Sequence, residues 1–271
     1  MKETLLEIAG KTDPGKVRER NEDSIALDPD LGLYVVADGM GGHNSGEVAS
    51  GLATDTILKF GREMLGGDKE IIPPGSDDTL SLRARQIVHF IKVANTVIYE
   101  KSKAFAKNHG MGTTVVAVLG DSKSLTVGHV GDSRLYRLRA DKLEQVTEDH
   151  SLVMDQVKSG LLTKEQAEKS NLQNILTRAL GTEPEVLVDV QDIAVEPGDV
   201  YCICSDGLTK MVSDEELAAV LAENKSPIET VDKLIEMSNA GGGVDNVTVA
   251  VARTPSSDGK GKGFFSRLIG G

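Results

Sequence analysis

The chain has 271 residues, a length that allows one large domain or two small ones. With 39% hydrophobic and 27% charged residues, it has the composition of a globular protein that can bury a core without a disulfide or a structural metal. Its 30 Lys and Arg against 42 Asp and Glu give a net charge of −12, which argues against a nucleic-acid-binding protein.

The sequence also indicates where the protein works. No apolar run reaches the ~20 residues needed to cross a bilayer, and residues 1–10 are too polar for a secretory signal. The two cysteines, Cys202 and Cys204, lie two residues apart on a predicted strand, so they share a face and do not easily form a disulfide. We therefore expect a cytoplasmic protein with buried free thiols and no transmembrane segment.

The first part of the chain combines a strand with two helices. Residues 33–37 are a predicted strand of apolar, partly β-branched residues. Residues 46–60 and 80–106 carry apolar stripes at spacings of three and four, which predict amphipathic helices. Residues 66–78 contain Pro and Gly and predict a loop, so the two helices should form a hairpin.

The middle of the chain consists of short strands that follow one another directly. These predicted strands cover residues 114–119, 125–130 and 134–139. The last of them enters a hairpin whose turn falls near Ala140 and Asp141. Strand after strand favours an antiparallel sheet over repeated βαβ units. Residues 150–171 are polar, have helical character and are interrupted by Gly160, which indicates a mobile surface lobe.

The last part alternates strands and helices before the composition changes. Predicted strands cover residues 200–204 and 247–251, and predicted helices cover residues 213–221 and 227–237. Ser213 and Glu216 have the spacing of a helix-capping pair. We expect one domain over residues 1–253 and a flexible tail over residues 254–271, whose apolar end either docks on a partner or membrane or stays unstructured.

Acidic residues recur at the ends of the predicted strands. They are Glu22, Asp23, Asp38, Asp132, Asp206 and Asp245. Any one of them is explained as a turn residue next to Gly or Asn. If the strands lie side by side, however, the carboxylates converge and repel one another unless cations separate them. Oxygen ligands without Cys or His indicate Mg²⁺, Mn²⁺ or Ca²⁺ rather than Zn²⁺, and their dispersion along the chain excludes an EF-hand.

Arg18 lies a few residues before these acids begin. A guanidinium beside two cations is suited to hold the oxygens of a phosphate. Two metal ions ~3.5–4 Å apart can share a water, lower its pKa and clamp an in-line displacement at phosphorus. Taken alone, Arg18 is better explained as a solvated charge beside Lys16 and Arg20.

Six short motifs in this order resemble the metal-dependent Ser/Thr protein phosphatases of the protein phosphatase 2C type. They are residues 18–24 (RERNEDS), 37–43 (ADGMGGH) with 46–47, 112–114 (GTT), 130–134 (VGDSR), 204–208 (CSDGL) and 245–248 (DNVT). The resemblance spans residues 4–253, and the form of the second motif is similar to the bacterial branch. It implies an α+β fold, a four-layer αββα sandwich of two mainly antiparallel β-sheets flanked by helices.

The resemblance also implies a set of metal ligands for two Mn²⁺ or Mg²⁺ ions. Matching positions make Asp38 the bridge between the metals, with the Gly39 carbonyl on one metal and Asp206 and Asp245 on the other. Glu22 and Asp23 would act close to the metals, in part through water, and Asp132 with Asp206 resembles a third, weaker site. Arg18 would bind the substrate phosphate, and residues 150–171 would form the variable flap beside the cleft.

The implied activity is hydrolysis of phosphoserine and phosphothreonine in proteins by metal-activated water. The expected partners are phosphorylated proteins, namely Hanks-type Ser/Thr kinases and their substrates, and the expected oligomeric state is a monomer. Two alternatives remain: a phosphatase dedicated to one regulatory protein, and a metal-binding module without turnover. The presence of Asp38, Asp206, Asp245 and Arg18 together argues against the module.

Other phosphate chemistries lack their residues here. Neither cysteine is followed by Arg at the spacing of a cysteine phosphatase, and the glycines at residues 39–46 are followed by Glu47 rather than by the Lys of a P-loop. One position departs from the family pattern: Met40 stands where eukaryotic members have a proposed general-acid His, and His43 is not matched to that role. We expect metal-bound water to protonate the leaving group.

Overall fold

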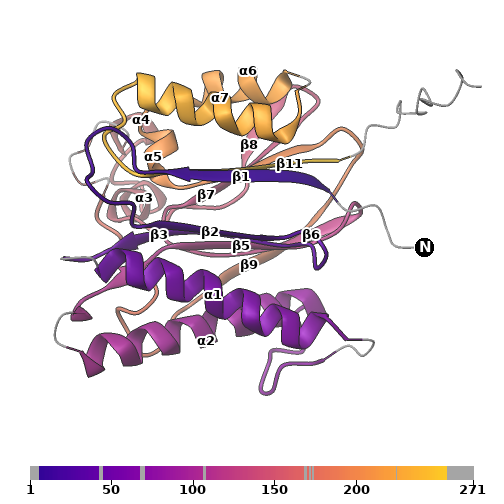
Figure 1. Ribbon diagram of the computed structural model, residues 1–271, viewed down its shortest axis with the longest axis vertical. Coiled ribbons are helices and arrows are strands. Elements are labelled where there is room, and N and C mark those ends of the chain that lie inside the picture. Colours follow the sequence, from indigo (N-terminus) through magenta and orange to yellow (C-terminus); the bar gives the residue numbers. More distant parts are fainter. Residues whose placement is uncertain are drawn as a thin grey trace, which may run out of the picture.

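The structure is a computed structural model that describes residues 6–42, 45–67, 71–105, 108–167, 170, 172, 174–223 and 225–254. Two antiparallel sheets face each other at its centre (Figure 1). One has the strand order β1-β11-β10-β7-β8, which are Glu7–Asp13, Val247–Arg253, Val200–Cys204, Arg134–Arg139 and Lys142–Gln145. The other has the order β2-β3-β5-β6-β9, which are Asp23–Asp28, Leu33–Met40, Val115–Gly120, Ser124–Val130 and Asp189–Ala194; β4, Gly112–Thr113, pairs with β3.

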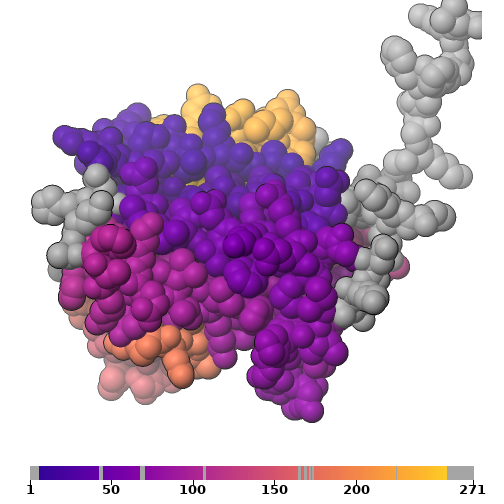
Figure 2. Space-filling model, turned by 60° about the horizontal axis from the view of Figure 1, so that its bottom comes forward, coloured from indigo at the N-terminus to yellow at the C-terminus, as the bar shows by residue number. Residues whose placement is uncertain are grey.

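Helices cover the outer face of each sheet. The hairpin of α1 (Ser45–Leu65) and α2 (Leu82–Ala104) packs on the β2–β9 sheet, and its side chains cover that face in Figure 2. On the other sheet lie α5 (Asp206–Thr209), α6 (Asp214–Ala222) and α7 (Pro227–Ala240) (Figure 1). The four-layer sandwich implied by the resemblance is therefore confirmed.

The strand β3 shows why the sequence builds such layers. Successive side chains of a strand point to opposite faces, so Tyr34 and Val36 pack between the sheets while Val35 and Ala37 pack under the helical hairpin. Both faces of β3 are buried, which explains its continuous apolar run. With few aromatic residues in the chain, aliphatic side chains fill most of both layers.

The predicted elements are found, and two strands longer than two residues were missed. The helices predicted over residues 213–221 and 227–237 are α6 and α7, and Ser213 with Glu216 forms the expected capping box. The turn between β7 and β8 falls on Ala140 and Asp141, whose φ values of 47° and 60° are those of a tight hairpin. The missed strands, β1 and β9, are only half-buried and lack an apolar run.

The polar stretch over residues 150–171 contains two short helices. The first, α3 (Leu152–Lys158), begins after Ser151, whose hydroxyl accepts a hydrogen bond from the backbone N–H of Met154. The second is α4 (Lys164–Ala167). Both cysteines lie on β10 and are free and buried, as expected. His43 and the tail from residue 255 lie outside the described residues.

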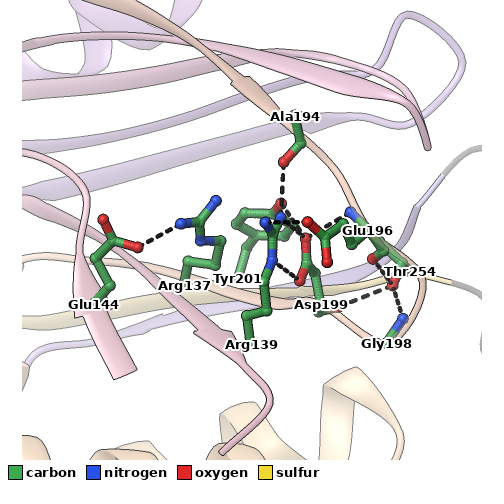
Figure 3. A network of polar contacts seen from close by, with 9 residues as sticks. All are labelled: Arg137, Arg139, Glu144, Ala194, Glu196, Gly198, Asp199, Tyr201 and Thr254. Atoms are coloured by element: carbon green, nitrogen blue, oxygen red, sulfur yellow. Dashed lines mark hydrogen bonds and ion pairs between the residues drawn. The ribbon is translucent and has the colours of Figure 1, made fainter. Parts of the chain in front are cut away.

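An ion pair between a buried aspartate and a half-buried arginine joins the two sheets at one end of the sandwich (Figure 3). Asp199 precedes β10 and accepts hydrogen bonds from Arg139 Nε and Nη2 at 2.7 and 2.6 Å, and from the Tyr201 hydroxyl at 2.8 Å. Arg139 also donates to the carbonyl of Ala194, the last residue of β9. Because Arg139 ends β7, this network lies at the opposite end of that strand from Asp132.

Candidate active site

The predicted acidic residues meet where the two sheets end together. The pairing of β2 with β3 places Asp23 opposite Asp38. In the facing sheet, β10 and β11 are neighbours, so Asp206, which follows β10, and Asp245, which precedes β11, lie at the same edge. Asp132 enters the same place from the connection between β6 and β7.

Asp23 connects the two sheets through its carboxylate. It lies on β2, but its Oδ2 accepts hydrogen bonds from Ser205 Oγ at 2.8 Å and Thr248 Oγ1 at 2.7 Å, both of the other sheet. Its Oδ1 is buried and has no hydrogen-bond partner among the described residues. Burial raises the pKa of Asp23 to about 6 against the lowering effect of the two hydroxyls.

Asp38 is half-buried at the centre of the cluster. Its backbone is fully bonded: its N–H donates to Thr114 Oγ1, and its carbonyl accepts from Thr113 Oγ1 and the Thr114 N–H. Among the described residues, no hydrogen bond or ion pair reaches its carboxylate. Burial raises the pKa of this carboxyl well above its usual range, and the charges of the other aspartates raise it further.

Asp121 shows what a turn aspartate does in the same protein. Asp121 directly follows β5, just as Asp38 comes at the end of the apolar run of β3. The Oδ1 of Asp121 accepts hydrogen bonds from the N–H groups of Lys123 and Ser124. Its Oδ2 pairs with Arg83 at 2.6 Å. The carboxylate of Asp38 makes none of these local contacts, so the turn explanation fails for Asp38.

Two cations lie on the outer side of the cluster. Arg18 Nη2 is 3.0 Å from Asp245 Oδ1, and Lys210 Nζ is 2.6 Å from Asp206 Oδ2 and 2.9 Å from Asp245 Oδ2. Asp206 Oδ1 remains buried without a hydrogen-bond partner in the described part of the chain. Lys210 was not predicted, although its spacing of four residues from Asp206, at the start of a helix, is a readable signal.

Glycine lets two backbones touch beside the acids. A Cβ at Gly39 would lie 2.1 Å from the Gly46 carbonyl oxygen and 2.5 Å from that of Glu22, so no other residue fits. The N–H of Gly39 donates to the Glu22 carbonyl at 3.0 Å. Burial raises the pKa of the Glu22 carboxyl, against the lowering effect of Arg18 and of the Gly46 backbone.

These observations test whether the residues fit divalent cations. The donor set is carboxylate and carbonyl oxygen, which hard cations prefer. Two buried carboxylate oxygens, Asp23 Oδ1 and Asp206 Oδ1, lack partners, and the cluster raises the pKa values of its own members. The residues therefore fit Mg²⁺ or Mn²⁺ and do not fit a soft metal.

A second group of metal-ligand residue types, His129, His150 and Asp189, lies apart from this cluster. The Gly131 N–H donates to His150 Nδ1 at 3.1 Å, which leaves the proton of neutral His150 on Nε2, facing Asp189 Oδ2 at 3.2 Å. A metal on Nε2 would have to displace that proton. We therefore assign the group to packing and hydrogen bonding; His129 lies buried on β6.

The pKa of Asp132 gives a pH-dependent prediction. Burial, followed by the charges of Asp206 and Asp149, raises this pKa to about 7 from 3.8. The ionised carboxylate therefore destabilises the fold, fully above pH 7 and progressively less as the pH falls towards 3.8. In EDTA at pH 8 we expect Asp132→Asn to stabilise the protein by about 2 kcal/mol, measured by urea unfolding. At pH 5 the gain should be smaller.

Asp141→Asn is the matched control for that experiment. Asp141 has a φ of 60° in the exposed hairpin turn, a conformation that Asn also adopts, so its stability should change little at either pH. An equal gain for Asp132→Asn at both pH values, or a loss at pH 8, would contradict the prediction.

Comparison with known proteins adds independent evidence. A family model described as protein phosphatase 2C matches residues 16–240. A serine/threonine phosphatase, stp, of Listeria innocua is 35% identical over 246 residues, covering 88% of this chain and 92% of the relative. The crystal structure of the Mycobacterium tuberculosis serine/threonine phosphatase PstP/Ppp superposes with a TM-score of 0.81 at 35% identity, covering 93% of this chain and 99% of that one.

A further solved structure bears on the metal. It is the catalytic domain of PstP in complex with two manganese ions, with a TM-score of 0.78 and 34% identity, and the match covers 93% of this chain and 99% of that one.

Within the described residues, no helix is both long and apolar enough to span a membrane.

Proposed function

Because this chain belongs to the protein phosphatase 2C family and is a serine/threonine protein phosphatase, we propose that its acidic cluster works with two divalent cations, Mn²⁺ or Mg²⁺. One observation carries the proposal: the carboxylate of Asp38 lies among four other carboxylates that raise its pKa, and added positive charge stabilises its ionised form. The manganese pair in the related PstP structure supports it.

The chain supplies oxygen ligands for each proposed metal position at this site. Asp38 would bridge the two cations, the Gly39 carbonyl would bind one, and Asp206 and Asp245 would bind the other. Glu22 and Asp23 would act beside them, in part through water. Asp132 with Asp206 would form a third, weaker site. The charge of Asp206 raises the pKa of Asp132, which supports this pairing.

The remaining residues position the reactants. When bound, the cation pair supplies an activated water nucleophile and neutralises the charge that develops on the phosphoryl oxygens. Arg18, half-exposed and held by Asp245, would bind the substrate phosphate and orient it for in-line attack. Ser205 and Thr248 fix Asp23 from the facing sheet, so the acids keep their places as substrate enters and leaves.

The test is phosphate release from a phosphothreonine peptide by the full chain. We expect turnover with Mn²⁺ or Mg²⁺, complete loss on adding excess EDTA, and recovery when the cation is restored. A peptide with phosphotyrosine at the same position serves as the control for substrate class. Turnover that persists in EDTA, or none with either cation, would contradict the proposed metal chemistry.

For the cellular role, we propose a cytoplasmic, monomeric enzyme that opposes Hanks-type kinases by dephosphorylating them and their substrates. The buried free thiols of Cys202 and Cys204 suit a reducing compartment. The alternative, a phosphatase dedicated to one regulatory protein, is distinguished by phosphoproteomics of a deletion strain. Many phosphorylation sites should rise under the first proposal and one protein under the second.

A further inference from the structure

Lys210 bridges two carboxylates that come from different parts of the chain. Its Nζ lies 2.6 Å from Asp206 Oδ2 and 2.9 Å from Asp245 Oδ2. Asp206 begins α5, whereas Asp245 precedes β11, so a single ammonium group joins a helix to a strand edge. Both carboxylates belong to the acidic cluster described above.

The backbone of Lys210 is held in place by a hydrogen bond, whereas its ammonium group can move. Its N–H donates to the Asp206 carbonyl at 2.9 Å, which ends the helical turn of α5. The side chain is 27% exposed, so the ammonium group can leave the carboxylates for solvent without moving the backbone. Burial lowers the pKa of Lys210, but Asp206 and Asp245 raise it above its ordinary value, so the group is charged at neutral pH.

Asp206 and Asp245 differ in how many of their carboxylate oxygens are free to bind a cation. Asp245 has both oxygens covered: Oδ1 by Arg18 and by the N–H of Asn246, and Oδ2 by Lys210. Asp206 keeps Oδ1 buried and without a partner among the described residues. A divalent cation can therefore reach Asp206 without breaking an ion pair, but it reaches Asp245 only by displacing a positively charged side chain.

We propose that Lys210 is a resident counter-cation that competes with a divalent cation for Asp206 and Asp245 and so lowers the affinity of that metal position. The proposal rests on the proposed function, because it takes these residues as metal ligands. Two consequences follow. The two metal positions should differ in affinity, with the one that uses Asp245 the weaker. Lys210 should also stabilise the acidic cluster when chelator removes divalent ions.

Two variants of Lys210 and one control variant separate the effect of the Lys210 charge from the effect of its side-chain shape. Lys210→Met keeps most of the side-chain length and removes the charge, and Lys210→Arg keeps the charge. Lys233→Met is the matched control, because Lys233 also pairs with an acidic side chain, Glu223, at similar exposure but on α7. Each full-length protein is stripped with EDTA and exchanged into buffer, and Mn²⁺ alone is then titrated in by calorimetry.

We expect Lys210→Met to lower the Kd of the weaker Mn²⁺ step about tenfold, the size expected for removing one charge a few ångströms from a divalent ion at a wet site. Its Tm in EDTA should fall below that of the wild type. Lys210→Arg should stay within about twofold of the wild-type Kd on the same electrostatic grounds. Lys233→Met should leave the Kd unchanged.

A second measurement does not need a folded metal-free variant. Protein loaded with Mn²⁺ is mixed with excess EDTA, and metal release is followed by the electron paramagnetic resonance signal. Release from Lys210→Met should be slower than from the wild type, because no ammonium group is present to replace the departing ion. Release at the wild-type rate or faster, together with an unchanged or higher Kd, would overturn the proposal.

The outcomes also separate this inference from the proposed function. Absence of Mn²⁺ binding by the wild type would contradict the proposed metal chemistry. If the wild type binds and is active while Lys210→Met binds no more tightly, the metal chemistry stands and the role of Lys210 is wrong. A tenfold change in Kd for Lys210→Arg as well would show that shape, not charge, sets the affinity, and would also overturn the proposal.

Discussion

Asp38→Asn is expected to lower the kcat for a phosphothreonine peptide by about a thousandfold, equal to about 4 kcal/mol of transition-state stabilisation. Asp38 is the residue that would bridge both cations, so one substitution weakens both positions. The same change removes a charge that desolvation and neighbouring carboxylates disfavour. In EDTA the variant should therefore unfold at a higher temperature than the wild type, while losing most of the stabilisation that added Mn²⁺ gives.

Asp121→Asn is the control for that prediction. Asp121 also follows a strand, but it serves a turn and pairs with Arg83. We expect its kcat to stay near the wild-type value and its stability to fall slightly in EDTA and in Mn²⁺ alike. If Asp38→Asn kept its turnover, or lost it while becoming less stable in EDTA, Asp38 would not be the centre of a metal site.

Asp199→Asn is expected to destabilise the fold by about 3 kcal/mol, because it removes the buried carboxylate of the network and leaves Arg139 with the exposed Glu196 as its acidic partner. The side chain of Asp199 is 1% exposed and holds Arg139, Tyr201 and the N–H of Glu196. For a chain of this size the Tm should fall by about 8 °C. Since the network lies far from the acidic cluster along β7, kcat at 15 °C should not change.

The pH dependence of this effect follows from the pKa of Asp199. Burial opposes ionisation, but the hydrogen bonds from Arg139, Glu196 and Tyr201 hold this pKa below its ordinary value. The stabilisation is therefore present above the unfolded pKa near 3.8 and is lost as the pH falls below it. Glu144→Gln, which removes an exposed partner of Arg137 in the same region (Figure 3), should change stability little. Equal losses for both variants would contradict the prediction.

Local pattern was enough for most of the fold. The helices with a clear apolar stripe and the strands with two buried faces were predicted close to their observed bounds, because burial and periodicity coincide there. The strands β1 and β9 were not, because β1 ends its sheet and β9 ends the other; their residues are half-buried, so the alternation is weak.

The meeting of the acidic residues was predictable from the sequence, but their individual contacts were not. Asp38 and Asp206 stand out because each comes at the end of an apolar run and belongs to a motif that carries the family resemblance. The bridge from Asp23 to Ser205 and Thr248 could not be read from the sequence, since it joins residues 182 and 225 positions apart. Lys210 was missed because a lysine is ordinarily a solvated charge; its spacing from Asp206 is a readable signal, but its contact with Asp245 is evident only in three dimensions.

The hydroxyls that reach Asp23 from the opposite sheet have a consequence for how substitutions in the core should behave. The distance between the two β-layers is set by side chains such as Tyr34, Val36 and Ile203, and the same distance determines where the carboxylate of Asp23 stands relative to Asp206. A change in the side chains packed between the layers therefore changes the geometry of the acidic cluster. We expect kcat to change with shifts in layer spacing that are too small to change the Tm measurably.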